Sequence, residues 1–513
     1  MTEPTARAAR DRGTRRPRRE AGLKQVPWRL LENPYAPIEV LRPEQVEAIH
    51  DASMTILERI GIELLGDEAL SILHAHGAAV DFASRRVRMD RALVLEWVAK
   101  APSRFTLHAR NPGRSLQIGG RSVVLCAVAG APNVSDLDRG RRPGSFADYR
   151  DLLRLTQSLN VLHLAAGYPV EPIDLPPATR HLEAYRAYVT LTDRVWQSSG
   201  IGAPRVEDAI AMNCLARGID RDRLAAEPGL LTTINTNSPL RVDAAMLDGL
   251  TAMARAGQAV IVTPFTLSGA MAPATLAAAL AQQNAEALAV LAYAQMVRPG
   301  APVLYGGFTS NVDMRSGAPA FGTPEYTKAA LAGGQLARRY GLPYRSSNAC
   351  AANAVDAQAA YESEMSLWGA VMGGAHLVKH GAGWMEGGLV ASFEKMVVDA
   401  EMLQMMAEFL QPLAVDEDSL GLSAIAEVGP GGHFFGAAHT LARYETAFYA
   451  PLLSDWRNFE SWRQAGAKDA AQRANAIWKQ LLADYQPPPL DPAVDEALAD
   501  YVARRTAEGG VPV

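Results

Sequence analysis

The sequence has little cysteine, no long apolar run and no excess of basic charge. Its three cysteines, Cys126, Cys214 and Cys350, lie far apart among 513 residues. This spacing excludes a disulfide-stabilised small domain and a Cys-x-x-Cys zinc site. The apolar stretch 285–297 is interrupted by Tyr and Gln, and it falls short of the roughly 20 residues that span a bilayer. With 50 Lys and Arg against 55 Asp and Glu, we expect neither nucleic acid nor a membrane as a partner.

The first 22 residues differ from the rest in composition. They contain seven arginines, three acids and almost no large apolar side chain. Such a segment cannot bury enough apolar surface to fold by itself, so we predict a disordered, Arg-rich arm. A transit peptide or a basic tether for a partner is the alternative. No signal-peptide run follows Met1, and we expect a cytoplasmic protein.

From residue 121 onward, short apolar runs alternate with longer segments whose apolar residues recur at helical spacing. The predicted strands are 122–128, 161–165, 195–198, 230–234, 259–262, 303–305, 344–347 and 377–380. The predicted helices are 145–157, 177–191, 206–217, 242–256, 274–297, 324–340, 356–373 and 393–409. Eight strands alternating with eight helices indicate a (β/α)8 TIM barrel. An open doubly wound sheet is the competing topology, because a strand count does not prove closure.

The segments on either side of this pattern are organised differently. Residues 23–120 mix helical periodicity with short strand-like runs. After residue 411 the chain is irregular, with a glycine-rich stretch at 429–436 and helical patterns at 454–485 and 491–505. We therefore expect four parts: the disordered arm (1–22), an N-terminal α+β cap (23–120), the barrel (121–410), and a C-terminal irregular and helical cap (411–513).

Active sites of such barrels lie at the carboxyl ends of the strands. The residues that follow the predicted strands are rich in amides, hydroxyls and aromatic rings, and poor in paired carboxylates and metal ligands. Aromatic faces with a nearby acid hold quaternary ammonium groups by cation–π attraction. Trp384 is the strongest candidate, because neighbouring glycines leave room beside it. For any single ring, ordinary barrel packing is the alternative.

Six stretches together resemble the trimethylamine methyltransferase family: 235–240, 257–273, 301–326, 337–348, 381–406 and 429–441. The resemblance runs from about residue 30 to 505, and it implies a barrel that moves a methyl group from a methylamine to a cobalt corrinoid on a separate protein. Archaeal trimethylamine enzymes carry pyrrolysine on the loop after the seventh strand, near Asn348–Cys350 here. This chain has ordinary residues there. It therefore resembles the non-pyrrolysine branch, which uses quaternary amines such as glycine betaine.

The chemistry of the substrate agrees with that branch. A quaternary ammonium leaves as a neutral tertiary amine, so its demethylation requires neither a metal nor a proton donor. The chain lacks the corrinoid-binding Asp-x-His-x-x-Gly, since none of its ten histidines has Asp two residues before it. We expect no metal and no tightly bound cofactor, with cobalamin supplied by a partner corrinoid-binding protein. We also expect a homo-oligomer.

On this hypothesis, strand-end residues divide into two groups. The ammonium end of the substrate would contact three aromatic rings and one acid, Trp384, Tyr305, Phe265 and Glu386. A betaine carboxylate would contact amides and an imidazole, Asn235, Asn237, Asn348 and His380. Arg345 or Lys379 could bind the carboxylate instead of these residues. The sequence identifies no catalytic residue.

The sequence leaves three alternative functions open. The methyl donor could be trimethylamine or another methylamine. The barrel could be a lyase or hydrolase, which would need a general acid–base pair at the rim. The chain could also be a quaternary-amine binding protein that transfers no methyl group.

Overall fold

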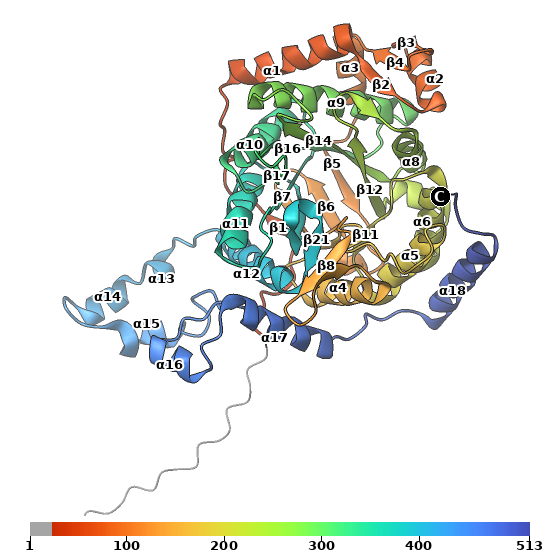
Figure 1. Cartoon of the computed structure of the whole chain (residues 1–513). Helices are drawn as coiled ribbons and strands as arrows, with labels where there is room; N and C mark the ends of the chain where they lie inside the picture. The colour runs from red at the N-terminus through yellow and green to blue at the C-terminus, as the bar shows by residue number, and fades with distance from the viewer. Residues whose placement is uncertain (1–22, 513) are drawn as a thin grey trace, which may run out of the picture.

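A closed barrel of eight parallel strands forms the centre of the computed structural model, which describes residues 23–512 (Figure 1). The predicted disordered arm lies outside the described residues. The barrel strands are β7 (Ser122–Ala127), β10 (Leu164–Ala165), β11 (Val195–Gln197), β12 (Leu230–Thr236), β14 (Ala259–Ser268), β15 (Val303–Gly306), β18 (Tyr344–Ser347) and β19 (Leu377–Ala382). Each strand pairs in parallel with the next, and β19 pairs with β7 to close the ring. The predicted TIM barrel is confirmed, and the open sheet is wrong.

Eight helices lie outside the strands, and each matches a predicted helical segment. They are α4 (Phe146–Ser158), α5 (Arg180–Leu191), α6 (Ala203–Arg217), α8 (Ala244–Arg255), α9 (Leu276–Val297), α10 (Pro324–Arg339), α11 (Ala357–Met372) and α12 (Phe393–Phe409). The short α7 (Arg221–Ala226) was not predicted. Helix α10 begins as the sequence indicates: the Thr323 hydroxyl accepts a bond from the Tyr326 amide, and Pro324 occupies the first turn.

Helix α9 is buried on every side, because other helices cover its outer face. The N-terminal helices α1 (Pro43–Thr55) and α3 (Arg91–Val98) pack against it. This explains why its sequence is apolar all round instead of amphipathic. Among the helices of residues 23–512, none combines the length and apolarity needed to cross a membrane.

The N-terminal elements pair with strands of the barrel region and pack on its helices. Strand β1 (Leu31–Glu32) pairs with β7. A small sheet joins β2 (Ile62–Leu64), β3 (Ala79–Asp81) and β4 (Arg86–Arg88) to β13 (Arg241–Val242), which follows barrel strand β12. Helix α2 (Asp67–Ala75) also packs on α9. One continuous apolar core therefore extends from these elements into the barrel wall.

A hairpin closes the amino end of the barrel. Strands β5 (Arg104–Leu107) and β6 (Leu116–Gly119) pair antiparallel. Their buried residues Leu107, Leu116 and Ile118 cluster with inward-facing residues of the barrel strands, such as Leu231 and Ile261. The lower part of the barrel is consequently a packed apolar core, which leaves the opposite, carboxyl end as the place for a site.

The C-terminal residues have two different environments. Helices α17 (Ala470–Ala483) and α18 (Pro492–Ala507) pack on the barrel helices, α17 on α12 and α4, and α18 on α5 and α6. Between α12 and α17, four short helices project away from the barrel (Figure 1). These are α13 (Glu417–Leu420), α14 (Leu422–Val428), α15 (Ala438–Leu441) and α16 (Phe459–Gln464).

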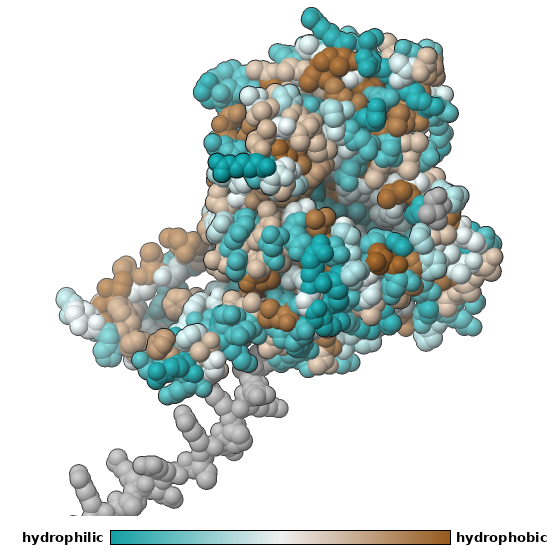
Figure 2. Space-filling model, viewed as in Figure 1, coloured by the Kyte–Doolittle hydropathy of each residue, from teal (hydrophilic) through white to brown (hydrophobic). Residues whose placement is uncertain are grey.

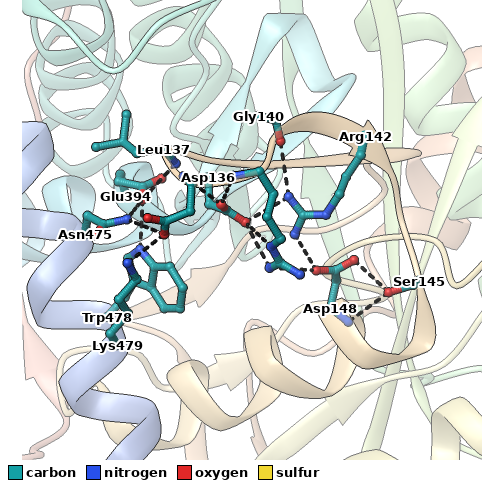
Figure 3. Close-up of polar contacts among 12 residues, drawn as sticks. Asp136, Leu137, Gly140, Arg142, Ser145, Asp148, Glu394, Asn475, Trp478 and Lys479 are labelled. Atoms are coloured by element: carbon teal, nitrogen blue, oxygen red, sulfur yellow. Dashed lines mark hydrogen bonds and ion pairs between the residues drawn. The ribbon is translucent and has the colours of Figure 1, made fainter.

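A second small sheet stands at the carboxyl end of the barrel. It joins β20 (Trp384–Met385), β21 (Val390–Ser392), β8 (Asn133–Asp136) and β9 (Gly140–Pro143). Figure 3 shows the polar cluster that holds its β8–β9 hairpin. Arg142 forms an ion pair with Asp136 at 2.8 Å and donates a hydrogen bond to Asp148 of α4 at 2.6 Å. Although burial opposes ionisation, hydrogen bonds and charge from Arg139 and Arg142 hold the pKa of Asp136 below its usual value.

Glu394 links the same hairpin to helix α17. Its buried carboxylate accepts the Leu137 amide at 3.2 Å, the Asn475 amide at 2.9 Å and the Trp478 indole N–H at 2.9 Å. Lys479 adds an ion pair with Asp138 at 2.7 Å. Helix α17 is thereby attached to the sheet that carries Trp384.

We expect Glu394→Ala to destabilise the protein, because three donors would lose their acceptor in a buried place. A buried donor without a partner costs about 1–3 kcal/mol, so the urea midpoint should fall clearly. Glu207→Ala is the matched control, since Glu207 forms an exposed ion pair with Arg221, and such pairs contribute about 0–1 kcal/mol. Equal urea midpoints for the two variants would contradict the structural role of Glu394.

Candidate active site

A cavity of about 590 Å³ opens at the carboxyl ends of the barrel strands. Figure 2 shows the molecule hollowed near the centre of the same face. Residues at or just after seven of the eight barrel strands line it, and β16 (Phe308–Val312), which follows β15, supplies Phe308. This volume suits a small molecule.

Alternation along the strands decides what faces the cavity. Side chains of a strand point alternately to its two faces, so every second residue of a barrel strand faces the interior. Along β14, Ala259 and Ile261 belong to the apolar interior, whereas Thr263 and Phe265 line the cavity. Along β19, Leu377 is interior and Lys379 lines the cavity. The interior therefore changes from apolar to polar and aromatic towards the opening.

Aromatic rings form one wall of the cavity. Phe265 and Phe308 are register partners on β14 and β16, and their rings stack at 5.3 Å. The Phe308 ring meets the Trp384 indole edge-on at 6.0 Å. Gly388 lets the chain pass close to this indole, because a Cβ there would lie 2.7 Å from Trp384 Cζ2. Aromatic rings that line a cavity can hold a cationic group.

Two buried cations adjoin the aromatic wall. The Lys379 ammonium donates to Gln197 Oε1 at 2.7 Å and to the Ala166 carbonyl at 2.8 Å. The Arg345 guanidinium donates to the Gly307 carbonyl at 3.2 Å and lies 5.2 Å from the Phe308 ring centre. Within residues 23–512, neither cation forms an ion pair with a carboxylate. Burial of an unpaired charge is costly, so the pair indicates a place for an anion.

The pKa values reflect the same desolvation. Burial, reinforced by the charge of Arg345, lowers the pKa of Lys379 to about 7. Burial also lowers the pKa of Arg345 to about 10. The one acid in the cavity lining, Glu171, already pairs with Arg180 at 2.6 Å. The cavity therefore has a surplus of positive charge.

His380 sits between the cations and the aromatic wall. Its ring stacks on Trp384 at 5.3 Å, and its Nδ1 is buried without a hydrogen-bond partner. Burial and the charges of Lys379 and Arg345 put the pKa of His380 well below its usual value, so the imidazole is neutral. Its φ of +54° is a strained conformation for a non-glycine residue, of the kind that clusters at functional sites.

The structure brings half of the predicted site residues to the cavity. Those on its lining are Trp384, Phe265, Asn235 and His380, together with the two basic alternatives Arg345 and Lys379. The other four, Tyr305, Glu386, Asn237 and Asn348, do not line it.

The prediction that Tyr305 lies in the site is wrong by one strand position. Its neighbour Leu304 faces the barrel interior, so Tyr305 points outward to helix α9. There its hydroxyl donates to Asn284 at 3.0 Å and accepts from Gln283 at 3.3 Å. The expectation that Tyr305 contacts a ligand is corrected by this alternation.

The remaining three residues are engaged in holding loops. Glu386 lies in a 3-10 turn (Glu386–Gly388) after β20 and accepts from Arg141 of β9 at 3.0 Å. Asn237 accepts the Asp243 amide at 2.8 Å before helix α8. Asn348 is buried and donates to the Gly381 carbonyl at 3.0 Å. Each of the three has at least one polar group engaged within the chain, and none lines the cavity. Asn348 also has a buried Oδ1 without a hydrogen-bond partner among the described residues.

Phe308 is the main cavity residue that sequence reasoning missed. It follows the predicted sixth strand, where a second short strand, β16, pairs with an extension of β14. Tyr168 and Gln197 were also missed. Gln197 was the last residue but one of a predicted strand, two after Val195, which faces the interior. Once the structure shows that Val195 faces inward, the alternation along the strand places Gln197 on the same side.

A second hollow, of about 680 Å³, lies outside the barrel beside α6 and α8. Its charged lining residues are mostly paired with each other, as in Arg255–Glu68 at 2.5 Å and Arg221–Glu207 at 2.8 Å. This hollow lies outside the barrel and away from the carboxyl ends of its strands, where active sites of such barrels lie.

A (β/α)8 barrel with a polar and aromatic cavity at its carboxyl end has the architecture of a barrel enzyme. The chain matches the trimethylamine methyltransferase (MTTB) family over residues 7–510. It is similar to a glycine betaine methyltransferase of Desulfitobacterium hafniense (strain Y51), with 38% identity over 92% of this chain and 98% of that protein. It is also similar to the trimethylamine methyltransferase MttB of Desulfitobacterium hafniense (strain DSM 10664 / DCB-2), with 29% identity over 91% and 94% of the two chains.

Among solved structures, the Methanosarcina barkeri monomethylamine methyltransferase (MtmB) aligns with 87% of this chain and 93% of its own, at a TM-score of 0.49 and 11% identity. The sequence matches decide the family. This chain belongs to the trimethylamine methyltransferase family, and it is a methyltransferase.

We predict that one lysine of this protein titrates near neutral pH. The chain has seven lysines, so NMR of lysine labelled with ¹³C at Cε should give few signals. Because burial lowers the pKa of Lys379, its ammonium should lose its proton as the pH rises through about 7. The Lys379→Met variant should lack that signal. If the signal with a midpoint near 7 persists in Lys379→Met, the assignment is wrong.

Proposed function

We propose that this methyltransferase moves a methyl group from a quaternary amine carrying a carboxylate, glycine betaine or a related betaine, to cob(I)alamin on a partner corrinoid protein. The observation that carries the proposal is the pairing of an aromatic wall with two buried cations in one cavity. Betaines carry a permanent cation and a carboxylate in one small molecule. The 38% identical relative that is named a glycine betaine methyltransferase supports the same substrate class.

The aromatic wall suits the ammonium end of a betaine. Phe265, Phe308 and Trp384 present apolar rings that attract a quaternary ammonium by cation–π interaction and exclude water from it. A quaternary nitrogen has no N–H to donate, so it needs no acceptor from the protein. A quaternary ammonium can therefore bind to this wall although none of its three rings is paired with an acid.

The two cations suit the carboxylate end. Among residues 23–512, no carboxylate pairs with Lys379 or Arg345, and a betaine carboxylate would supply one. The neutral imidazole of His380 and the Asn235 amide could add hydrogen bonds. A purely cationic donor such as trimethylammonium would instead meet uncompensated positive charge. This is the reason to prefer a betaine over trimethylamine.

The methyl acceptor in this proposal is a second substrate and not a resident cofactor. Cob(I)alamin supplies a nucleophile for the methyl carbon; the C–N bond breaks with its electron pair left on nitrogen, so the amine leaves neutral and no proton is transferred. The protein's contribution is to hold the methyl group in place and to exclude water. A cavity of about 590 Å³ is sized for the donor, so the corrinoid would reach it from a partner protein at the opening.

The loop after β18 fits the branch without pyrrolysine. Asn348 and Cys350 are buried there, and neither lines the cavity. Burial raises the pKa of the Cys350 thiol to about 12, which keeps it protonated and unreactive. No side chain of this loop therefore takes the place of the specialised residue of the trimethylamine enzymes.

A panel of methyl donors with free cob(I)alamin tests the proposal. Glycine betaine should be demethylated at the highest kcat/KM, above choline, which lacks the carboxylate, and above trimethylamine. Lys379→Met should lower kcat/KM for betaine and leave that for choline nearly unchanged. Preferred turnover of trimethylamine would overturn the substrate class. Betaine binding without methyl transfer, even with a corrinoid protein, would overturn the activity.

We expect Trp384→Ala to lower kcat/KM for betaine roughly 30-fold or more, because a desolvated cation–π contact contributes about 2 kcal/mol. Trp384→Phe should retain most of the activity, since a ring remains. Trp97→Ala, on helix α3, is the control for general effects of losing a tryptophan. Circular dichroism should show that each variant is folded. Full activity in Trp384→Ala would remove the aromatic wall from the mechanism.

A further inference from the structure

Residues 411–459, which make up most of the segment between helices α12 and α17, form an arm that has almost no core of its own. Between residues 411 and 450 the buried residues are Gly421, Ala424 and Ala437. The arm is nevertheless folded locally: Asp416 caps α13, and Asp418 pairs with Arg443. Short helices in water gain most of their stability from packing an apolar face. Within residues 23–512, the short helices of this arm have almost no such packing.

The arm exposes an unusual number of large apolar side chains. Figure 2 shows hydrophobic residues along it. Six examples, each more than two-thirds exposed, are Leu413, Val415, Leu422, Phe435, Phe448 and Trp456. Exposed apolar surface that is contiguous and this large marks an interaction site. Surface of this kind points to a binding partner for the arm.

A second uncovered apolar surface lies at the base of the arm. On α11, Tyr361 and Met365 are one turn apart and exposed; on α12, Met405 and Phe409 are one turn apart and exposed. Helix α12 runs directly into the arm, and Tyr35 stacks on Phe409 at 5.0 Å. The arm and this helix face are thus neighbouring parts of one apolar surface.

We propose that a second copy of this chain covers both surfaces: each copy lays its arm on the α11–α12 face of the other. A two-fold axis makes such an interface self-complementary, because each copy contributes an arm and a face. A fully covered aromatic side chain buries roughly 150–250 Å². Covering the arm's six exposed aromatic side chains, which are 45–85% exposed, therefore supplies on the order of 1,000 Å² per copy. That amount reaches the range of permanent dimers.

The position of the arm favours a permanent partner over the methyl acceptor. No arm residue lines the cavity, and Figure 1 shows the arm projecting sideways from the barrel. A corrinoid protein must come and go at the cavity opening, which would leave the arm uncovered between turnovers. A second copy covers it continuously.

Sedimentation velocity of the full chain at micromolar concentration tests this directly. We expect a species of at least twice 55.0 kDa. Phe435→Asp with Phe448→Asp in the arm, and Met365→Asp on α11, should each raise the dissociation constant at least tenfold. Phe82→Asp is the control, because Phe82 is a similarly exposed ring on the N-terminal sheet. A monomeric wild type would overturn the proposal, as would arm variants with the wild-type dissociation constant.

Amide hydrogen exchange distinguishes loss of the interface from a failure of the variant to fold. Amides of α14 should exchange slowly in the wild type and at least tenfold faster in Met365→Asp, which changes no residue of the arm. Amides of the barrel strands should keep their wild-type rates in the same sample. Fast exchange of α14 in the wild type, slowed only when a corrinoid protein is added, would overturn the proposal in favour of that partner.

Discussion

Closure of the eight-stranded barrel is the constraint on which the rest of the structure depends. Once β12 pairs with β14 and β19 with β7, every second side chain of each strand must share one interior. The lower part of that interior is filled by apolar residues and by the β5–β6 hairpin. Only the carboxyl end is left open, so the inward positions there become the cavity. The same rule sends Tyr305 outward to α9 while Phe265 faces in.

The cavity combines groups that would be unfavourable in an ordinary core. Lys379 and Arg345 are desolvated and pair with no carboxylate in the part of the chain that the structure describes, and His380 has a strained backbone. Natural chains keep such costly arrangements where a ligand compensates for them. Neighbouring amide and carbonyl groups, such as Gln197, reduce the cost without neutralising the charge. The site is therefore prepared for an anionic group beside an aromatic surface.

The position of Trp384 depends on elements far from it in the sequence. It stands on β20, whose small sheet includes the β8–β9 hairpin. That hairpin is held by Asp148 of α4, and by Glu394, which binds Trp478 of α17 (Figure 3). Helix α17 thus supports the cavity wall, although it follows the exposed arm. Folding of the C-terminal residues and assembly of the site are physically linked through these buried carboxylates.

Much of the fold could be predicted from the sequence, because the strands and helices follow local periodicity and cap chemistry, as at Thr323 and Pro324. Strand ends also identified Trp384, Phe265 and His380. The sequence could not show which side of a strand faces inward, so Tyr305 was misplaced, nor that β16 would bring Phe308 beside Phe265. Side-chain direction and pairing between distant strands are set by closure of the barrel, a long-range constraint. Residue chemistry was thus determined by the sequence, and its arrangement around one cavity by the tertiary structure.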